Sequence, residues 1–248
     1  MTRTILITGG SRGIGRACAI LAGSRGWNVM LTYVANPAAA DEAVEAVKAA
    51  GGRALAIKAN AAKEPEVAAA FDAAEKAFGP VDGFVNNAAF GTPMGRLIDK
   101  KPEDIAVLVE TNVLGALLGA REAARRMAKS RGGRGGSIVN MSSAAARLGM
   151  PGEGVDYAAS KGSIDTLTLG LARELGPEGV RVNAVRPGLI ATEFHAAMGA
   201  PGRAERLGQS VPVGRAGTAD EVAEAVIWLL SDAASYVSGA LLDVTGGR

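Results

Sequence analysis

The feature that most constrains the fold is an apolar run followed at once by a glycine-rich turn and an alanine-rich helical stretch. Residues 4–8 read Thr-Ile-Leu-Ile-Thr, which is typical of a buried strand. Residues 9–15 read Gly-Gly-Ser-Arg-Gly-Ile-Gly, and the helical stretch continues to Ser24. Glycine lets a backbone turn tightly and approach a pyrophosphate, whose charge faces the helix amino-terminus. This order predicts dinucleotide binding, with an ordinary glycine turn as the alternative.

Apolar runs and helical stretches alternate along the rest of the chain. Alternation of this kind predicts a parallel sheet with helices on both faces and a ligand at the carboxyl ends of the strands. No linker, internal repeat or low-complexity tract divides the 248 residues. We therefore expect an α/β fold, a single Rossmann-type domain over residues 1–248 with seven parallel strands in doubly wound order. The apolar runs end near Thr8, Tyr33, Ile57, Asn86, Met141, Val185 and Val244.

A second pattern joins a tyrosine to a lysine. Tyr157 and Lys161 are four residues apart, so they would share one face of a helix. A free tyrosine has a pKa of about 10 and is a poor base at neutral pH, so an ammonium that lowers this pKa would activate it. Ser143, after the preceding strand, could hold the oxygen that gains or loses the proton. The pattern favours proton transfer to a carbonyl or alcohol oxygen; the alternative is a surface tyrosine beside a solvated lysine.

These residues together resemble the classical short-chain dehydrogenase/reductase family over the whole chain. Two departures are visible: the family's Asn-Asn-Ala-Gly ends in Ala89 here, and residues 149–154 slightly lengthen the stretch before the tyrosine. Neither removes a catalytic group, and the longer stretch is expected to reshape the pocket mouth. The nearest resemblance is to bacterial members of the glucose-dehydrogenase and 3-oxoacyl-reductase type. The signatures are Thr8-Gly9-x-x-x-Gly13-x-Gly15, Asn86-Asn87-Ala88-Ala89, Asn112, Ser143 with Tyr157 and Lys161, and Arg186-Pro187-Gly188.

The resemblance implies a catalytic role for each polar group of this set. Tyr157 would give a proton to the carbonyl oxygen as hydride arrives from the nicotinamide, or take one in the reverse direction. Lys161 would lower the Tyr157 pKa and hold the ribose hydroxyls, while Ser143 would fix the substrate oxygen. Asn112 would hold a water that links Lys161 to solvent, in a helix beginning near residues 101–102.

The resemblance also implies cofactor contacts at the ends of several strands. The glycine loop would bind the pyrophosphate, and Asn60 would lie near the adenine. The backbone at Asn86 and Ala88 would pass the adenosine ribose, and residues 187–190 with Thr192 would meet the nicotinamide amide and the phosphates. The expected cofactor-binding residues are Gly9, Ser11, Arg12, Gly13, Ile14, Gly15, Tyr33, Asn60, Ala61, Asn86, Ala88, Tyr157, Lys161, Pro187, Gly188, Ile190 and Thr192.

The second strand bears on which cofactor is used. Rossmann sites that prefer NAD usually place an acid at the end of this strand, where it bonds the ribose 2′-hydroxyl. Residues 28–36 contain no acid, and the first one after them is Asp41. Arg12, in the glycine loop, could pair with a 2′-phosphate. We therefore expect a preference for NADP(H), with NAD(H), or use of either cofactor, as the alternative.

Composition argues against several other functions. The net charge of +2 indicates neither nucleic acid nor an anionic membrane as a partner. The single cysteine, Cys18, is expected in the core, and no Cys/His cluster predicts a metal site. No leader sequence follows Met1, and no apolar run is long enough to cross a bilayer. We therefore expect a cytoplasmic protein whose partner is a small-molecule carbonyl or alcohol.

The sequence leaves the substrate and the protein partners open. Residues 191–213 are expected to form a lid over the substrate. The basic, glycine-rich residues 129–136 could meet an acidic acyl-carrier protein or could be a flexible, solvated connection. The resemblance implies a homotetramer in which helices around residues 105–127 and 157–175 pack against their copies. Candidates for the substrate pocket are Met150, Glu153, Phe194, His195 and Met198.

Other interpretations differ in the class of protein. An enoyl reductase typically spaces the tyrosine and lysine further apart, and a sugar-nucleotide epimerase carries a longer substrate region. A non-catalytic NAD(P)-sensing protein commonly lacks one of the pair, and an NAD-dependent sugar or alcohol dehydrogenase stays open. The complete catalytic set favours an enzyme: Asn112, Ser143, Tyr157 and Lys161.

Overall fold

The computed structural model describes residues 2–248, and at its centre is one sheet whose neighbouring strands are all parallel. The sheet has seven strands, as the apolar runs predict. Each predicted carboxyl end agrees with the observed one to within two residues. The strands are β1 (Thr4–Ile7), β2 (Asn28–Tyr33), β3 (Arg53–Lys58), β4 (Gly83–Asn86), β5 (Gly136–Met141), β6 (Val180–Pro187) and β7 (Leu241–Val244).

Helices fill the connections between the strands, so the chain alternates as predicted. One of these connections contains a π-helical turn, Glu110–Leu114, between two α-helices. None of the helices among residues 2–248 has the length and apolar character that a bilayer-spanning segment requires. The α-helices are α1 (Gly13–Ser24), α2 (Pro37–Ala49), α3 (Glu64–Phe78), α4 (Pro102–Val109), α5 (Gly115–Met127), α6 (Ala145–Leu148), α7 (Val155–Leu175), α8 (Phe194–Ala197), α9 (Arg203–Gly208) and α10 (Ala219–Leu230).

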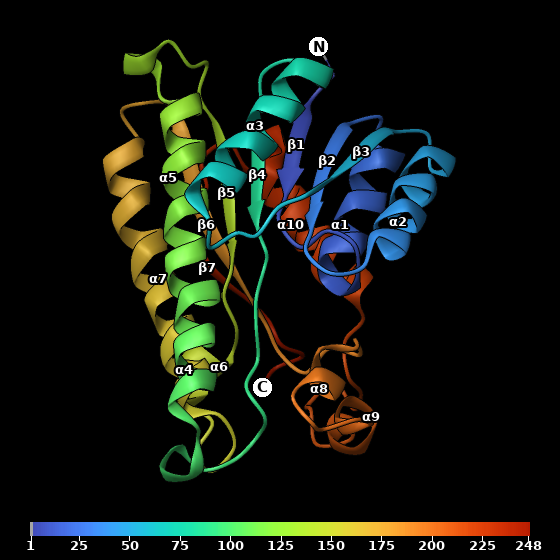
Figure 1. The fold of residues 1–248 in the computed structure, drawn as a ribbon, viewed down its shortest axis with the longest axis vertical. Coiled ribbons are helices and arrows are strands. Elements are labelled where there is room, and N and C mark those ends of the chain that lie inside the picture. Colours follow the sequence, from blue (N-terminus) through green and yellow to red (C-terminus); the bar gives the residue numbers. More distant parts are fainter. Residues whose placement is uncertain (1) are drawn as a thin grey trace.

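The sheet is covered on both faces, which is why its strands read as continuous apolar runs. In β1, Ile5 and Ile7 face a core that includes residues of α1, α2 and α10. Leu6, between them, faces a second core that includes residues of α3, α5 and α7. In Figure 1, α5 and α7 run alongside each other, while α1 and α2 lie at the other end of the sheet. This confirms the predicted architecture, with helices on both faces of a doubly wound sheet.

The strand order, β3-β2-β1-β4-β5-β6-β7, reverses its direction between β1 and β4. In such sheets the connections leave in opposite directions at the reversal, and a crevice opens at the carboxyl ends of the two strands. Figure 1 shows α8 and α9 beyond these strand ends, across from α4 and α6. Both short helices belong to residues 191–213, whose role as a lid stays a prediction.

Two expectations outside the crevice can be compared with the structure. Cys18 is fully buried in α1, as expected for a core residue. The basic residues 129–136 begin with a 3-10 turn, Lys129–Arg131. The Ser130 N–H donates a hydrogen bond of 2.8 Å to the carboxylate of Glu178, after α7. The basic segment is therefore anchored at its start.

Candidate active site

A cavity of about 540 Å³ lies at the carboxyl ends of the strands. It brings together the glycine loop, the ends of β2 to β6 and part of residues 191–213. Two predicted site residues, Asn86 and Asn112, do not line it, and neither does the pocket candidate Glu153. The predicted residues that do line it are Gly9, Ser11, Arg12, Gly13, Ile14, Gly15, Tyr33, Asn60, Ala61, Ala88, Ser143, Met150, Tyr157, Lys161, Pro187, Gly188, Ile190, Thr192, Phe194, His195 and Met198.

The glycine loop is packed so closely at Gly15 that a side chain is excluded from this position. A Cβ added at Gly15 would lie 2.4 Å from the carbonyl oxygen of Gly9 and 2.7 Å from the amide nitrogen of the Asn87 side chain. Gly9 and Gly13 have φ of +65° and +52°, which favour glycine. The start of α1 therefore presents bare backbone to the cavity, which fits a dinucleotide pyrophosphate.

The two asparagines after β4 have different roles. The Asn86 side chain is buried and donates to the Ala116 carbonyl at 2.8 Å and to Asn140 Oδ1 at 3.1 Å. Asn87 lines the cavity, and its Nδ2 donates to the carbonyls of Thr8 (2.8 Å) and Gly9 (3.0 Å). The resemblance implies that the backbone at Asn86 passes the adenosine ribose, and this stays a prediction; the side chain that reaches the glycine loop is that of Asn87. Because the two are adjacent in one motif, only their orientation in the fold separates them.

Tyr157, at the start of α7, shares a hydrogen bond with the Ser143 side chain. Burial raises the pKa of Tyr157 to about 12, against a smaller lowering by this bond from Ser143. The prediction that Lys161 brings the net pKa of Tyr157 below its ordinary value is wrong for this structure, because desolvation of the phenolate outweighs the other effects. At neutral pH the phenol is therefore protonated and able to donate.

Lys161 is buried and faces the same cavity. Its ammonium donates to the Met141 carbonyl at 2.7 Å and lies 5.7 Å from the centre of the Tyr157 ring. Burial lowers the Lys161 pKa to about 8, and the charge of Asp165 acts in the opposite direction. Asp165 is held by Arg186, whose guanidinium donates to it at 2.7 and 3.0 Å. The lysine thus has a carbonyl in front of it and an anchored carboxylate nearby.

Asn112 lies in the π-helical turn rather than in a regular α-helix. Its Oδ1 accepts from the Phe90 N–H at 2.7 Å, and its Nδ2 donates to the Phe90 carbonyl at 2.9 Å and to Ser160 Oγ at 3.1 Å. Ser160 in turn donates to the Tyr157 carbonyl at 2.7 Å. Such turns often occur at functional sites. Here the turn ties the segment after β4 to α7, and a role in a water relay stays a prediction.

A family model described as enoyl-(acyl carrier protein) reductase matches residues 9–248. The chain belongs to the short-chain dehydrogenase/reductase family. A solved short-chain dehydrogenase/reductase from Serratia marcescens is similar to it with a TM-score of 0.89 and 36% identity, covering 99% of this chain and 97% of that chain. The resemblance seen in the sequence motifs is thereby confirmed.

Two curated relatives are similar to this chain over nearly their full lengths. One is the uncharacterized oxidoreductase YgfF of Escherichia coli K12, 49% identical over 98% of both chains. The other is glucose 1-dehydrogenase 2 of Bacillus subtilis 168, 37% identical over 99% of this chain and 94% of its own. The protein is thus an oxidoreductase of a family that uses NAD(P)(H) on small-molecule substrates.

The end of β2, where the sequence predicts that a 2′-phosphate would lie, carries no acid over residues 33–36. The end of β2, residues 33–36, lines the cavity together with Arg12. Asn36 is engaged as the cap of α2, because its Oδ1 accepts from the Ala39 N–H at 3.1 Å. Arg12 is exposed and makes no ion pair within residues 2–248. A cationic side chain therefore stands at the cavity edge opposite an uncharged strand end.

Sequence reasoning missed a buried ion pair beside Tyr157. The Lys100 ammonium lies 3.6 Å from Asp156 Oδ1, and both side chains are almost fully buried. Thr92 bridges them, since its hydroxyl accepts from Lys100 at 2.7 Å and donates to Asp156 at 2.6 Å. This cluster fixes the segment after β4 to the start of α7, next to Tyr157. Its members are separated by up to 64 residues in sequence, so no local motif announces it.

Glu153, the pocket candidate that does not line the cavity, is bonded to Arg203, which does line it. Both terminal nitrogens of Arg203 donate to the Glu153 carboxylate, at 2.9 and 2.5 Å. The hydrogen bonds from Arg203 hold the Glu153 pKa below its ordinary value. Arg203 begins α9, so this pair ties residues 191–213 to the loop before α7.

The buried ion pair predicts a large stability effect. Lys100→Met leaves the Asp156 carboxylate buried without its cation, which should lower the free energy of unfolding by about 3–5 kcal/mol in urea denaturation. Lys101→Met, at the exposed neighbouring position, is the control and should have little effect. Lys100→Met combined with Asp156→Leu should recover most of the loss. Equal stability of the two single lysine variants would contradict the assignment.

The Lys161 pKa predicts a pH dependence of stability. The folded pKa, about 8, lies below the ordinary 10.5, so between these values the unfolded chain holds a proton that the folded chain has released. Stability relative to Lys161→Met should therefore rise with pH from about 8 to 10.5. Urea denaturation of the wild type and of Lys161→Met across this range measures the difference in their free energies of unfolding. The titration of Tyr157 contributes to both proteins and cancels in this difference. A flat or falling difference would show that Lys161 is not desolvated.

Proposed function

We propose that the protein transfers hydride between NADP(H) and a carbonyl or secondary alcohol, with Tyr157 as the general acid and base. The observation that supports this most is the Ser143–Tyr157 hydrogen bond beside the buried Lys161, in the same cavity as the glycine loop. When bound, the nicotinamide group supplies or accepts the hydride. The remaining chemistry is proton transfer, which falls to side chains of this chain.

Each catalytic side chain has a distinct task in the proposed reduction. The phenol of Tyr157, protonated at neutral pH, donates its proton to the substrate oxygen. The Ser143 hydroxyl donates to the same oxygen and stabilises the negative charge that develops on it. Lys161 stabilises the phenolate left behind, because its ammonium lies 5.7 Å from the centre of the Tyr157 ring. In the oxidation direction the proton moves the other way.

The proposed preference for NADP(H) rests on charge. A 2′-phosphate brings negative charge to the end of β2, where residues 33–36 carry no carboxylate to repel it. Arg12, at the N-cap of α1, is exposed and free to donate paired hydrogen bonds to phosphate oxygens. NAD(H) lacks the group that Arg12 would bind, so it should bind more weakly.

We further propose that residues 1–248 act as one domain, that residues 191–213 act as a substrate lid, and that the protein forms a homotetramer. The Arg203–Glu153 pair and the bond from Met94 N–H to the Met198 carbonyl support the lid, because they hold it against the site. Exposed apolar side chains on the helices predicted to pack against their copies support the assembly. They are Val107, Val109, Leu114, Leu117 and Leu169.

Removal of the phenolic hydroxyl tests the catalytic proposal. Tyr157→Phe should lower kcat by about 10² to 10⁴-fold on any substrate that the wild type turns over, with NADPH affinity retained. The measurement is steady-state absorbance of NADPH, with Tyr236→Phe as the control because Tyr236 is fully exposed. Full activity of Tyr157→Phe would exclude the assigned role. Cofactor binding without turnover by the wild type would favour the sensing protein.

Removal of one charge tests the cofactor proposal. Arg12→Ala should weaken NADPH binding by about 10-fold or more, since a hydrogen bond to a charged group contributes roughly 1.5–3 kcal/mol, and should leave NADH binding almost unchanged. Dissociation constants for both cofactors come from calorimetry. Arg25→Ala is the matched control, because Arg25 follows the other end of α1 and pairs with Glu224. Tighter binding of NADH than NADPH by the wild type would refute the preference.

A further inference from the structure

We infer that the active site takes ketones or secondary alcohols whose reacting carbon carries an apolar group, and that it disfavours polyhydroxylated substrates. The inference rests on the proposed function, since it concerns the substituents of the carbonyl that Tyr157 would protonate. The observation that carries it is the environment of the Tyr157 ring, where apolar side chains converge and the buried charged groups are paired with one another.

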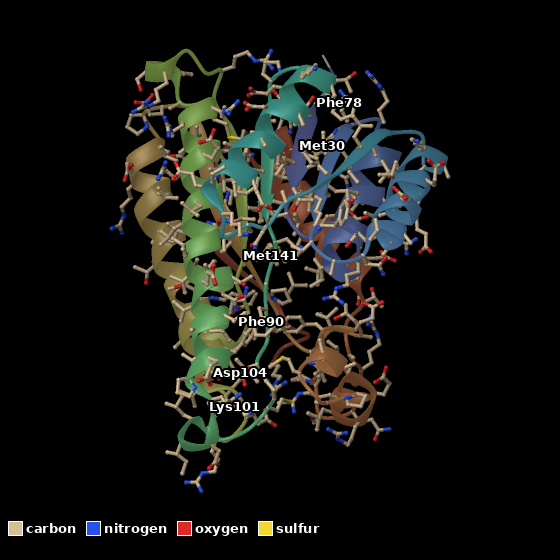
Figure 2. All side chains as sticks on the ribbon, viewed as in Figure 1. Met30, Phe78, Phe90, Lys101, Asp104 and Met141 are labelled. Carbon is tan, nitrogen blue, oxygen red and sulfur yellow. The ribbon has the colours of Figure 1, made fainter. Side chains whose placement is uncertain are left out.

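The Tyr157 ring lies against an apolar wall drawn from three separate segments. Phe90, Met150 and Phe194 pack against the cluster that contains Tyr157, and all three line the cavity. The Phe194 ring centre is 5.6 Å from that of Tyr157, with the planes tilted by 48°. Phe90 lies on the segment that follows β4 (Figure 2). A substituent beside the reacting carbonyl would therefore meet carbon surfaces, which favour apolar groups.

The lid side of this wall is held in place by a close backbone approach. A Cβ at Gly91 would lie 2.5 Å from Met198 Cγ and 3.1 Å from Phe194 Cζ, so a side chain at this position would displace the Met198 side chain from its place in the wall. The Met94 N–H donates to the Met198 carbonyl at 3.0 Å, and Met198 is nearly fully buried. Phe194 and Met198 are thereby set over the site as parts of its wall.

Met150 reaches the cavity from a strained backbone. Its φ of +45° is the only positive value of a non-glycine residue within residues 2–248. A bulky side chain rarely adopts this conformation, and such outliers concentrate where a site needs them. Gly149 and Gly152, with φ of +72° and +75°, form the rest of the turn. A third glycine would remove the strain, yet a methionine that packs on the Tyr157 cluster occupies the position.

The polar groups around the wall are largely used by one another. Arg203 is buried and bonds the Glu153 carboxylate with both terminal nitrogens. His195 lies in the lining, is hydrogen-bonded to the Ile190 backbone, and its pKa is lowered by burial, so it is neutral. Arg248 also lines the cavity and has no carboxylate partner within residues 2–248.

Glu193, which is exposed, also lines the cavity without an ion pair within residues 2–248. Neither Arg248 nor Glu193 belongs to the apolar wall, so the wall itself offers no partner to the hydroxyls of a sugar. A hydroxyl that loses its water on binding and finds no partner weakens binding, whereas an apolar group gains from the same burial. Lys100, Thr92 and Asp156, the remaining polar groups close to Tyr157, bond each other behind the wall. The geometry therefore discriminates against hydroxyls beside the carbonyl.

The test compares substrates that differ in polarity around the reacting carbon. Steady-state kcat/KM is measured on the full chain for acetophenone and 2-octanone, and for 1,3-dihydroxyacetone and D-glucose, with NADPH or NADH for reduction and NADP⁺ or NAD⁺ for oxidation. The apolar ketones should exceed the hydroxylated compounds by about 100-fold or more. Equal or faster turnover of the hydroxylated compounds would overturn the inference and leave the proposed function standing. No turnover of any ketone or alcohol would overturn both.

A substitution at Met150 tests whether the apolar wall causes the preference for apolar substrates. Met150→Asn keeps a residue that tolerates positive φ and replaces the apolar side chain by an amide. The kcat/KM for acetophenone should fall about 10-fold, mainly through KM, and the ratio to dihydroxyacetone should narrow, while the melting temperature is kept. Ile98→Asn, an exposed apolar side chain outside the cavity lining, is the control. An unchanged ratio in Met150→Asn with a retained fold would refute the role of the wall.

Discussion

The side chain of Asn87 fastens the glycine loop to the end of β4, and the geometry of the cavity depends on this joint. Its amide donates to the carbonyls of Thr8 and Gly9 at the point where the strand order reverses. The Thr8 hydroxyl makes a second contact between the two segments, because it accepts a hydrogen bond of 2.9 Å from the Asn87 N–H. Each half of the sheet carries part of the site, so the reacting groups can meet only if these two strand ends stay together.

The catalytic groups are arranged by burial as much as by charge. Desolvation moves the pKa of Tyr157 upward and the pKa of Lys161 downward, which disfavours the charged form of each group. A protonated phenol suits donation to a carbonyl oxygen. The carboxylate of Asp165, fixed by Arg186, keeps the lysine from losing its charge more easily. The proposed chemistry thus depends on two buried groups, Tyr157 and Lys161, with an anchored carboxylate beside the lysine.

Charged side chains around the site are paired with one another in two ion pairs. Lys100 with Asp156, and Arg203 with Glu153, each join a loop to the region that precedes or begins α7. Their charges are used to hold backbone segments in place rather than to face the substrate. What remains at the Tyr157 ring is apolar, and this arrangement connects the stability of the loops to the selectivity proposed for the site.

The sequence by itself determined the strands, the helices, the glycine loop and the Tyr157–Lys161 pair, because hydrophobic period, turn residues and helical spacing are local properties. It also placed most of the cavity lining through motifs at strand ends. Only the tertiary structure decided that the Asn87 side chain meets the glycine loop, that the Tyr157 pKa rises, and that Asp156 pairs with Lys100. These depend on side-chain orientation, on burial and on partners distant in sequence, and packing of the whole chain sets all three.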